Sequence, residues 1–151
     1  MGRLGTVLIL LYVLTGLSCY SGQFKGWTKD DMVVMKHYYN SFKADKEYLR
    51  VAKSIGPKGM PTNEERVYLR QQMVIAAEEA RKVLEHPETL DKMHPKLREL
   101  YEDNYLKGIE LTIQNMDSPD EATARYSDHL HNYYMQWYED HWEEIKFPKE
   151  K

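Results

Sequence analysis

His141 and Glu144, three positions apart near the end of the chain, are the residues most suited to binding a metal ion. On a helix this spacing puts the imidazole and the carboxylate on one face, where both could be ligands. Helical bundles that bind two metals use Glu-x-x-His motifs, and none of the six histidines follows a Glu at that spacing. We therefore predict no metal and no cofactor, and we keep a small-ligand or metal-binding helical bundle centred on His141 as the alternative.

Catalytic chemistry has less support in the sequence. No nucleophile elbow, zinc-protease motif or glycine-rich phosphate loop occurs. Asp31 and Asp45 border the apolar face of the first predicted helix, where they could form an acid pair or meet Arg66 and Arg70 from the next helix. We expect them to reach solvent or the arginines rather than to form an acid pair, and we predict that the protein is not an enzyme.

Binding to another protein is better supported, by the residues between Asp117 and Ile145. This segment holds eight acidic residues and one basic residue, Arg125. Four of the acids lie near the C-terminal end of a predicted helix, where the helix dipole disfavours negative charge. The segment also contains tyrosines and tryptophans, and the alternative to partner binding is that their rings only pack against a neighbouring helix. We predict a face for a protein partner, with a basic one favoured by the charge, formed by Tyr138, Glu139, Trp142 and Glu143.

Length and composition limit the remaining classes. The chain has 151 residues, of which 42% are hydrophobic and 30% are charged, as is typical of one globular domain. The formal net charge is −3, so no basic excess is present to bind the phosphates of a nucleic acid. A single cysteine excludes a disulfide framework and a cysteine-based zinc site.

The N-terminus has the pattern of an export signal. Arg3 precedes a run of fourteen uncharged, mostly apolar residues from Leu4 to Leu17. This run is shorter than the roughly 20 residues that span a membrane, and it matches the apolar region of a secretory signal peptide. The first six residues also match an N-myristoylation pattern, which is short enough to occur by chance. We therefore predict a signal peptide over residues 1–18.

The lone cysteine, Cys19, directly follows Gly16-Leu17-Ser18 at the end of that run. This arrangement resembles the lipobox of bacterial lipoproteins, in which a small residue precedes the cysteine, although Leu usually stands where this chain has Gly16. The resemblance implies diacylation of Cys19, which would become the first residue of a protein held in the cell envelope by its lipid. Plain cleavage after a small residue is the alternative, and it would give a periplasmic or secreted protein.

Helical periodicity predicts the elements that position these groups. Apolar residues recur at helical spacing over four segments, 28–55, 62–85, 95–116 and 118–145. Thr28, Thr62 and Ser118 are the expected caps of three of them, and one helical turn is expected between His86 and His94. In the last segment, the stripe expected to face the core consists of Tyr126, Leu130, Tyr133, Tyr134, Trp137, His141 and Ile145.

Short connections between these segments predict an all-α fold, an antiparallel up-down four-helix bundle. The predicted organisation is a signal peptide over 1–18, a linker over 19–27, the bundle over 28–147 and a tail over 148–151. The function predicted from the sequence is that of an exported, lipid-anchored cell-envelope protein. It would act as a non-enzymatic interaction module, either an accessory subunit or an immunity or exclusion factor.

Overall fold

The computed structural model describes residues 26–148, and every regular element among them is helical. The longer helices are α2 (Lys29–Ile55), α3 (Asn63–Leu84), α6 (Lys107–Asp117) and α7 (Glu121–Asp140). The shorter elements are the 3-10 turn η2 (Gly56–Lys58), α4 (Glu88–Met93), α5 (Leu97–Leu100) and the π-helix η3 (Tyr101–Leu106). The all-α prediction is confirmed for this part of the chain, whereas the predicted signal peptide and Cys19 lie outside it.

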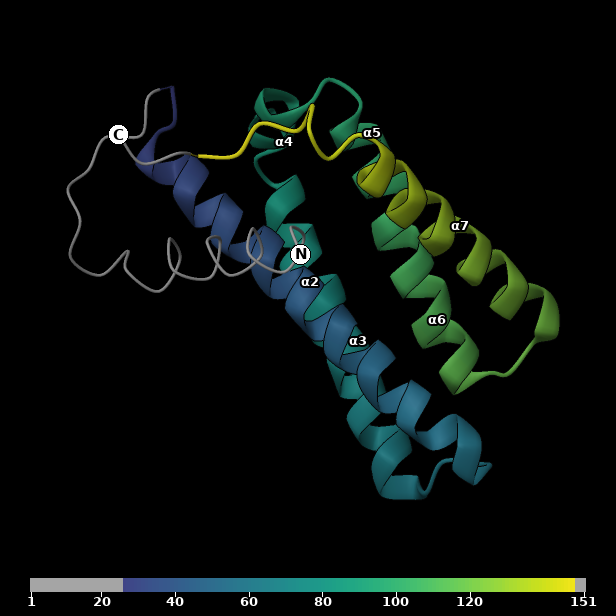
Figure 1. The fold of residues 1–151 in the computed structure, drawn as a ribbon. Helices are drawn as coiled ribbons and strands as arrows, with labels where there is room; N and C mark the ends of the chain where they lie inside the picture. The colour runs from purple at the N-terminus through teal and green to yellow at the C-terminus, as the bar shows by residue number, and fades with distance from the viewer. Residues whose placement is uncertain (1–25, 149–151) are drawn as a thin grey trace, which may run out of the picture.

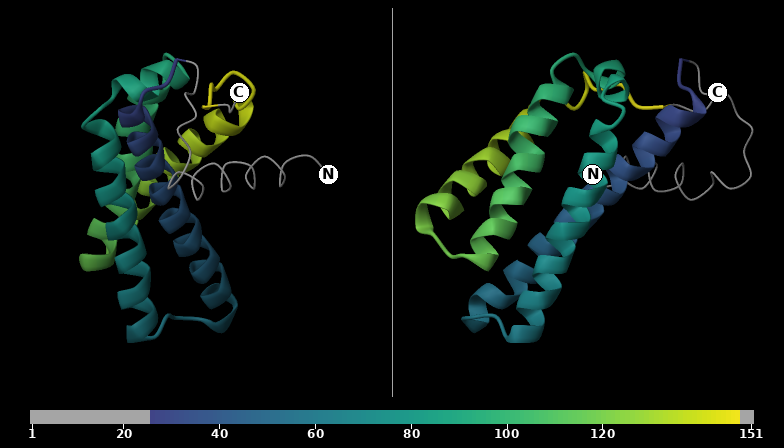
Figure 2. Two further views of the ribbon diagram at one scale, coloured as in Figure 1. Left: turned by 90° about the vertical axis from the view of Figure 1, so that its left-hand side faces the viewer. Right: turned by 180° about the vertical axis from the view of Figure 1, so that it is seen from behind.

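In the described part of the chain, two antiparallel helical hairpins make up the fold (Figure 1). α2 pairs with α3, and α6 pairs with α7, which also packs against η3 directly before α6; the hairpins meet where α3 packs against α6 and η3. The α2–α3 hairpin projects past the loop that joins α6 to α7 (Figure 2). The expected four-helix bundle is not confirmed, because α2 and α7 approach each other mainly through long side chains. Among the described residues, no helix has the length and apolar character needed to cross a membrane.

The predicted starts of the first two helices are confirmed. Thr28 caps α2 and Thr62 caps α3, and in each case the third helical residue, Asp31 or Glu65, completes a capping box. α2 ends at Ile55 as expected, and the following turn contains Gly59, whose φ of 102° is a conformation that favours glycine. The single helical turn expected after residue 86 is also present, as α4.

The predicted third and fourth helices differ from the structure at three points. The third is not uniform, because η3 inserts a π-helical turn between α5 and α6. Asp120, rather than Ser118, caps the fourth helix, since its carboxylate accepts a hydrogen bond from the backbone of Thr123. That helix, α7, also ends at Asp140 instead of Ile145.

The early end of α7 has a tertiary cause. After Asp140 the chain turns back across the end of the fold, so that Ile145 is only 6% exposed and belongs to the core. The next residue, Lys146, donates its backbone N–H to the carbonyl of Met93 at 2.9 Å. Continuing the helix would abandon this contact and the burial of Ile145, which together outweigh the helical periodicity of the sequence.

Aromatic rings fill the space between the hairpins. The most buried of them, each at most 3% exposed, are Tyr38, Tyr101, Tyr105 and Tyr134. Phe42 of α2 stacks on Tyr105 of η3 with ring centroids 4.7 Å apart. The hydroxyls of Tyr38 and Tyr134 lie 3.1 Å apart and form a hydrogen bond from α2 to α7. Burial raises the pKa of Tyr38, Tyr105 and Tyr134 well above the ordinary value, so these hydroxyls stay neutral.

Small and charged residues together join α2 to α3. Three alanines of α3 are at most 1% exposed and allow the two backbones to approach closely: Ala76, Ala77 and Ala80. Ser41 of α2 donates a hydrogen bond to the carbonyl of Ala76 at 2.8 Å. At the rim of this contact, the Glu79 carboxylate lies 2.8 Å from Nδ1 of His37 and accepts a hydrogen bond from Asn40 at 3.0 Å.

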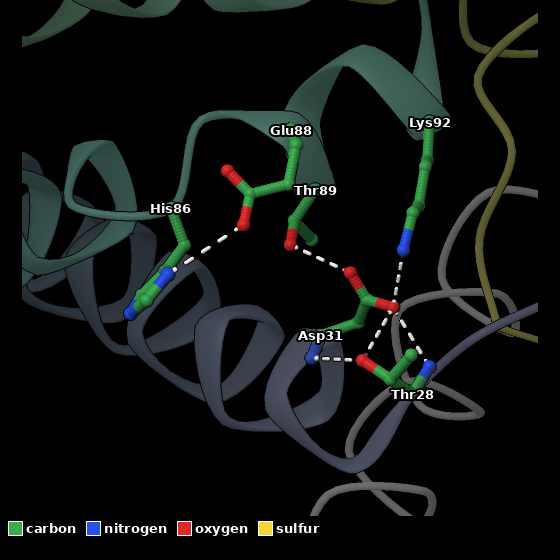
Figure 3. A network of polar contacts seen from close by, with 6 residues as sticks. All are labelled: Thr28, Asp31, His86, Glu88, Thr89 and Lys92. Atoms are coloured by element: carbon green, nitrogen blue, oxygen red, sulfur yellow. Dashed lines mark hydrogen bonds and ion pairs between the residues drawn. The ribbon is translucent and has the colours of Figure 1, made fainter.

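Asp31 fixes the start of α2 against α4 (Figure 3). Asp31 is 3% exposed, and its carboxylate accepts hydrogen bonds from Thr89 Oγ1 at 2.8 Å and from Lys92 Nζ at 2.6 Å. The backbone N–H of Thr28 donates to the same carboxylate at 2.7 Å. Burial opposes ionisation of Asp31, but the hydrogen bonds from Lys92, Thr28 and Thr89 outweigh it and lower the pKa of Asp31 to about 2.

Replacing Asp31 by Ala should lower the free energy of unfolding at pH 7 by about 2–4 kcal/mol, because the buried Thr89 hydroxyl and the partly buried hydrogen bonds from Thr28 and Lys92 lose their acceptor. The folded-state pKa of Asp31 lies below its unfolded-state value, so the ionised group stabilises the fold above about pH 4. This contribution is lost as the pH falls towards 2, and the effect of Asp31→Ala should therefore be smaller at pH 3. Urea unfolding at the two pH values measures both effects.

The exposed neighbour Asp30, in the same first turn, provides the matched control. Asp30→Ala removes one charge from the favourable end of the helix dipole and should cost no more than about 1 kcal/mol. Equal losses for the two variants would show that Asp31 acts only through the dipole.

Candidate functional site

A cavity of about 110 Å³ lies among α2, α3, α6 and α7. Asp45 and Tyr48 line it from α2, and Ser127, Asp128 and His131 line it from α7. The positions of Asp45 and His131 follow from helix geometry. Asp45 lies three residues after the core ring Phe42, and His131 lies three residues before the core ring Tyr134, so each shares the inward face of its helix.

Asp45 and His131 face each other within this cavity. The Asp45 residue is 4% exposed, and its Oδ2 lies 3.6 Å from Nε2 of His131, which is longer than a hydrogen bond. Nε2 of His131 is buried and has no hydrogen-bond partner among the described residues. Burial raises the pKa of Asp45 to about 6, although the nearby His131 acts in the opposite direction. The pair therefore combines a buried carboxyl that titrates near neutral pH with an imidazole nitrogen that lacks a partner.

The hydroxyl groups beside this pair are already engaged in structural hydrogen bonds. Ser127 Oγ donates to the carbonyl of Gly108 at 2.8 Å and lies 2.6 Å from the hydroxyl of Thr112. The two helices approach closely at Gly108, where a Cβ would lie 3.4 Å from backbone atoms of both Ser127 and His131. The serine thus joins α6 to α7, and its hydroxyl proton is donated to a backbone carbonyl rather than to a general base that would activate the oxygen for attack.

The structure separates the four residues predicted to bind a partner into two kinds. Glu139 and Glu143 are exposed, whereas Tyr138 and Trp142 are half-buried. The Tyr138 ring packs 5.8 Å from Phe42 of the core, measured between centroids. Trp142 packs against Tyr138 on one side and against Phe147 on the other, with centroid distances of 5.4 and 4.9 Å. The two rings therefore have structural contacts, while the two carboxylates are directed to solvent.

Sequence reasoning missed the exposed tyrosines of α7. Tyr126 and Tyr133, which were expected in the core stripe, are 46% and 52% exposed. The buried face of α7 consists instead of Ser127, Leu130 and Tyr134. Because aromatic residues surround much of this helix, its hydrophobic periodicity did not define which of them would face the core.

His141 does not form the ligand pair expected with Glu144. It caps the end of α7, its ring stacks on Trp137 at 4.7 Å, and its Nδ1 lies 2.9 Å from the Trp137 carbonyl. Glu144 instead lies 3.7 Å from Nε2 of His94. Within residues 26–148, no group of three His, Cys, Asp or Glu side chains is arranged to hold a metal ion.

The arginines expected beside Asp31 and Asp45 have other partners. Arg70 forms an ion pair with Asp117 at 2.7 Å, and Arg66 donates to the carbonyl of Pro61. The prediction was wrong because the aspartates face inward, toward α4 and α7, where long arginine side chains on the outer side of α3 do not reach. The two aspartates also form no acid pair with each other, since each lies in a separate buried setting.

A larger depression of about 720 Å³ lies between α2 and α3. Tyr68 and Ile75 contribute apolar surface to it, and each is about two-fifths exposed, at 40% and 37%. Among its charged side chains, Glu47 binds Arg50 and also accepts a hydrogen bond from the Tyr68 hydroxyl, whereas the exposed Lys43 and Lys46 form no ion pair with a described residue. These two lysines leave the depression with positive charge that no described carboxylate pairs.

The fold and the site define a small helical protein of two hairpins that buries a carboxylate beside an imidazole. Comparison with known proteins adds no closer assignment: no family model, no curated protein and no solved structure matches this chain.

Replacing Asp45 by Asn should raise the free energy of unfolding at pH 7.5 by about 1–3 kcal/mol, because the amide avoids the cost of burying a charge. The folded-state pKa of Asp45, about 6, lies above the value of 3.8 expected for the unfolded chain. The folded protein therefore binds this proton more tightly, and its stability falls as the pH rises from about 4 through 6. The advantage of Asp45→Asn should disappear at pH 4, and urea unfolding at the two pH values measures it.

Asp103→Asn removes one exposed carboxylate of η3 and controls for the change in net charge. If Asp45→Asn destabilised the protein equally at pH 4 and pH 7.5, the charge of Asp45 would not be the cause.

Proposed function

We propose that this protein is a non-enzymatic interaction module, held at the cell envelope, that binds a basic protein partner through the acidic end of α7. Its two hairpins would pack as the four-helix bundle that the sequence predicts. The partner would be a component of an envelope complex, for which this chain serves as an accessory subunit or as an immunity or exclusion factor.

The negative charge at the C-terminal end of α7 carries the proposal. Glu139 and Asp140 end the helix, and no basic residue occupies its last turn. Glu143 follows closely; like Glu139, it is exposed and has no ion-pair partner among the described residues. The helix dipole disfavours an acid at this end by about 0.3–1 kcal/mol. These carboxylates therefore weaken the fold that carries them, and a basic partner would reverse the penalty.

Aromatic rings next to these carboxylates support the same surface. Trp142 is half-buried and held between Tyr138 and Phe147, so its exposed edge has a defined position. Ordering this ring before binding reduces the entropy lost in forming a complex. Tryptophan and tyrosine beside charged residues are typical anchors of protein interfaces.

Two further arguments complete the proposal. The engaged hydroxyls of Ser127 and Thr112 favour a binding role over nucleophilic catalysis. The apolar run that ends at Cys19 favours export and a lipid anchor, with a secreted form as the alternative.

Replacing Glu139 and Glu143 together by Lys should abolish capture of the partner and raise the free energy of unfolding by about 0.3–1 kcal/mol. The opposite directions of these two effects separate a binding role from a structural one. Capture is measured by cross-linking and affinity purification from detergent-solubilised envelopes of the source cells, and stability by urea unfolding.

Glu102→Lys, at an exposed position on η3, makes one charge reversal outside the proposed surface and should retain capture. A partner that the double variant still captures with full yield would contradict the proposed surface. A double variant that is less stable than the natural protein would show that the carboxylates serve the fold.

The intact mass of the protein extracted from its source cells in mild detergent tests the anchor. The expected species begins at Cys19 and carries the mass of acyl chains, and Cys19→Ser should move the protein from the membrane fraction to the soluble fraction. An unmodified chain that begins between residues 19 and 22 would identify a secreted or periplasmic protein. A chain that retains Met1 would contradict export.

A further inference from the structure

The carboxylate of Asp45 lines the cavity, and its surroundings do not fully compensate the cost of burying its charge. Asp45 is 4% exposed and accepts no hydrogen bond from any described residue. Its nearest charged or polar partner, Nε2 of His131, is 3.6 Å away and has no hydrogen bond of its own. Burying an ionised group without donors is strongly unfavourable. The space in front of Asp45 therefore suits a ligand that brings both hydrogen-bond donors and positive charge.

We propose that this cavity binds an alkylammonium group, whose charge pairs with Asp45 and Asp128 and whose aliphatic part contacts Leu49 and Ile109. All four residues line the cavity. Leu49 is 37% exposed and Asp128 is also exposed, so the cavity is accessible from solvent on their side. Its volume of about 110 Å³ is smaller than the roughly 150 Å³ cavity that binds benzene. A propylammonium ion or the end of a lysine side chain is of suitable size.

Other ligand classes fit the same walls less well. An anion would be repelled by the two carboxylates. A coordinated metal ion would need a third ligand, and the described residues offer no such group of three. A neutral alcohol would leave the charge of Asp45 unpaired. The hydroxyls of Ser127 and Thr112 are hydrogen-bonded to each other and to the Gly108 carbonyl, so the carboxylates are the principal acceptors for a ligand's donors.

This inference does not depend on the proposed function, since the ammonium group can belong either to a free amine or to a lysine of a protein. The test is a titration of the full chain with n-propylammonium chloride at pH 7.5, followed by amide NMR shifts. At this pH the carboxyl of Asp45, with a pKa of about 6, is mostly ionised. Saturable shifts are expected at residues of the cavity wall, including Asp128 and Ser127.

Two variants and one neutral probe make the test specific. Asp45→Asn, which is expected to fold, should weaken binding by about tenfold or more, because it removes the buried charge from a charge-assisted hydrogen bond. The exposed Asp103→Asn should not. Ala124→Leu keeps both carboxylates but fills the cavity that Ala124 lines, and it should abolish binding. n-Propanol, which has the same chain without the charge, should bind at least tenfold more weakly than the amine.

A second titration, with N-acetyl-lysine methylamide, distinguishes the two sources of the ammonium group. Binding of this compound supports a site for a lysine side chain, and binding of propylammonium alone supports a site for a free amine. Absence of saturable binding by both compounds would overturn the proposal. So would equal binding of propanol, equal displacement by potassium ions, or undiminished binding to Asp45→Asn.

Discussion

The contact between the two hairpins depends on tyrosines that are buried up to their hydroxyl groups. Most buried hydroxyls have a hydrogen-bond partner, and that of Tyr38 on α2 is the hydroxyl of Tyr134 on α7, far away in the sequence. The buried hydroxyl of Tyr101 has none among the described residues. Ser41, one turn after Tyr38, lies 3.1 Å from the hydroxyl of Tyr105 on η3. These polar ends specify the register of the rings, whereas an aliphatic core of similar volume would allow the hairpins to slide.

The same register explains why a carboxylate is buried in this protein. On α2, Tyr38, Phe42 and Asp45 follow one another at helical spacing, so the face that carries the two rings also carries the acid. On α7, His131 precedes Tyr134 by one turn and is brought opposite Asp45 at 3.6 Å. The rings keep α2 and α7 apart at a distance that the shorter Asp and His side chains do not span with a hydrogen bond. A cavity remains between them.

Two features of the molecule lower its stability without a visible structural benefit, and both involve carboxylates. One is the acidic end of α7, where the helix dipole and the negative side chains oppose each other. The other is Asp45, whose burial raises its pKa to about 6. Asp31 is the contrasting case, because four hydrogen-bond contacts from Thr28, Thr89 and Lys92 stabilise its charge. The difference between these aspartates lies in the supply of donors, not in the extent of burial.

Local sequence signals were sufficient for the all-α class, for the capping boxes at Thr28 and Thr62, and for the end of α2 before Gly56. Each of these features depends on hydrogen bonds or backbone conformations within a few residues, so the neighbouring sequence decides them. Tertiary packing decided the end of α7 at Asp140, the exposure of Tyr133 and the pairing of Asp45 with His131. These depend on contacts between distant segments, and a helix with aromatic residues around much of its circumference can present several faces to a core. Only the packed hairpins select one of them.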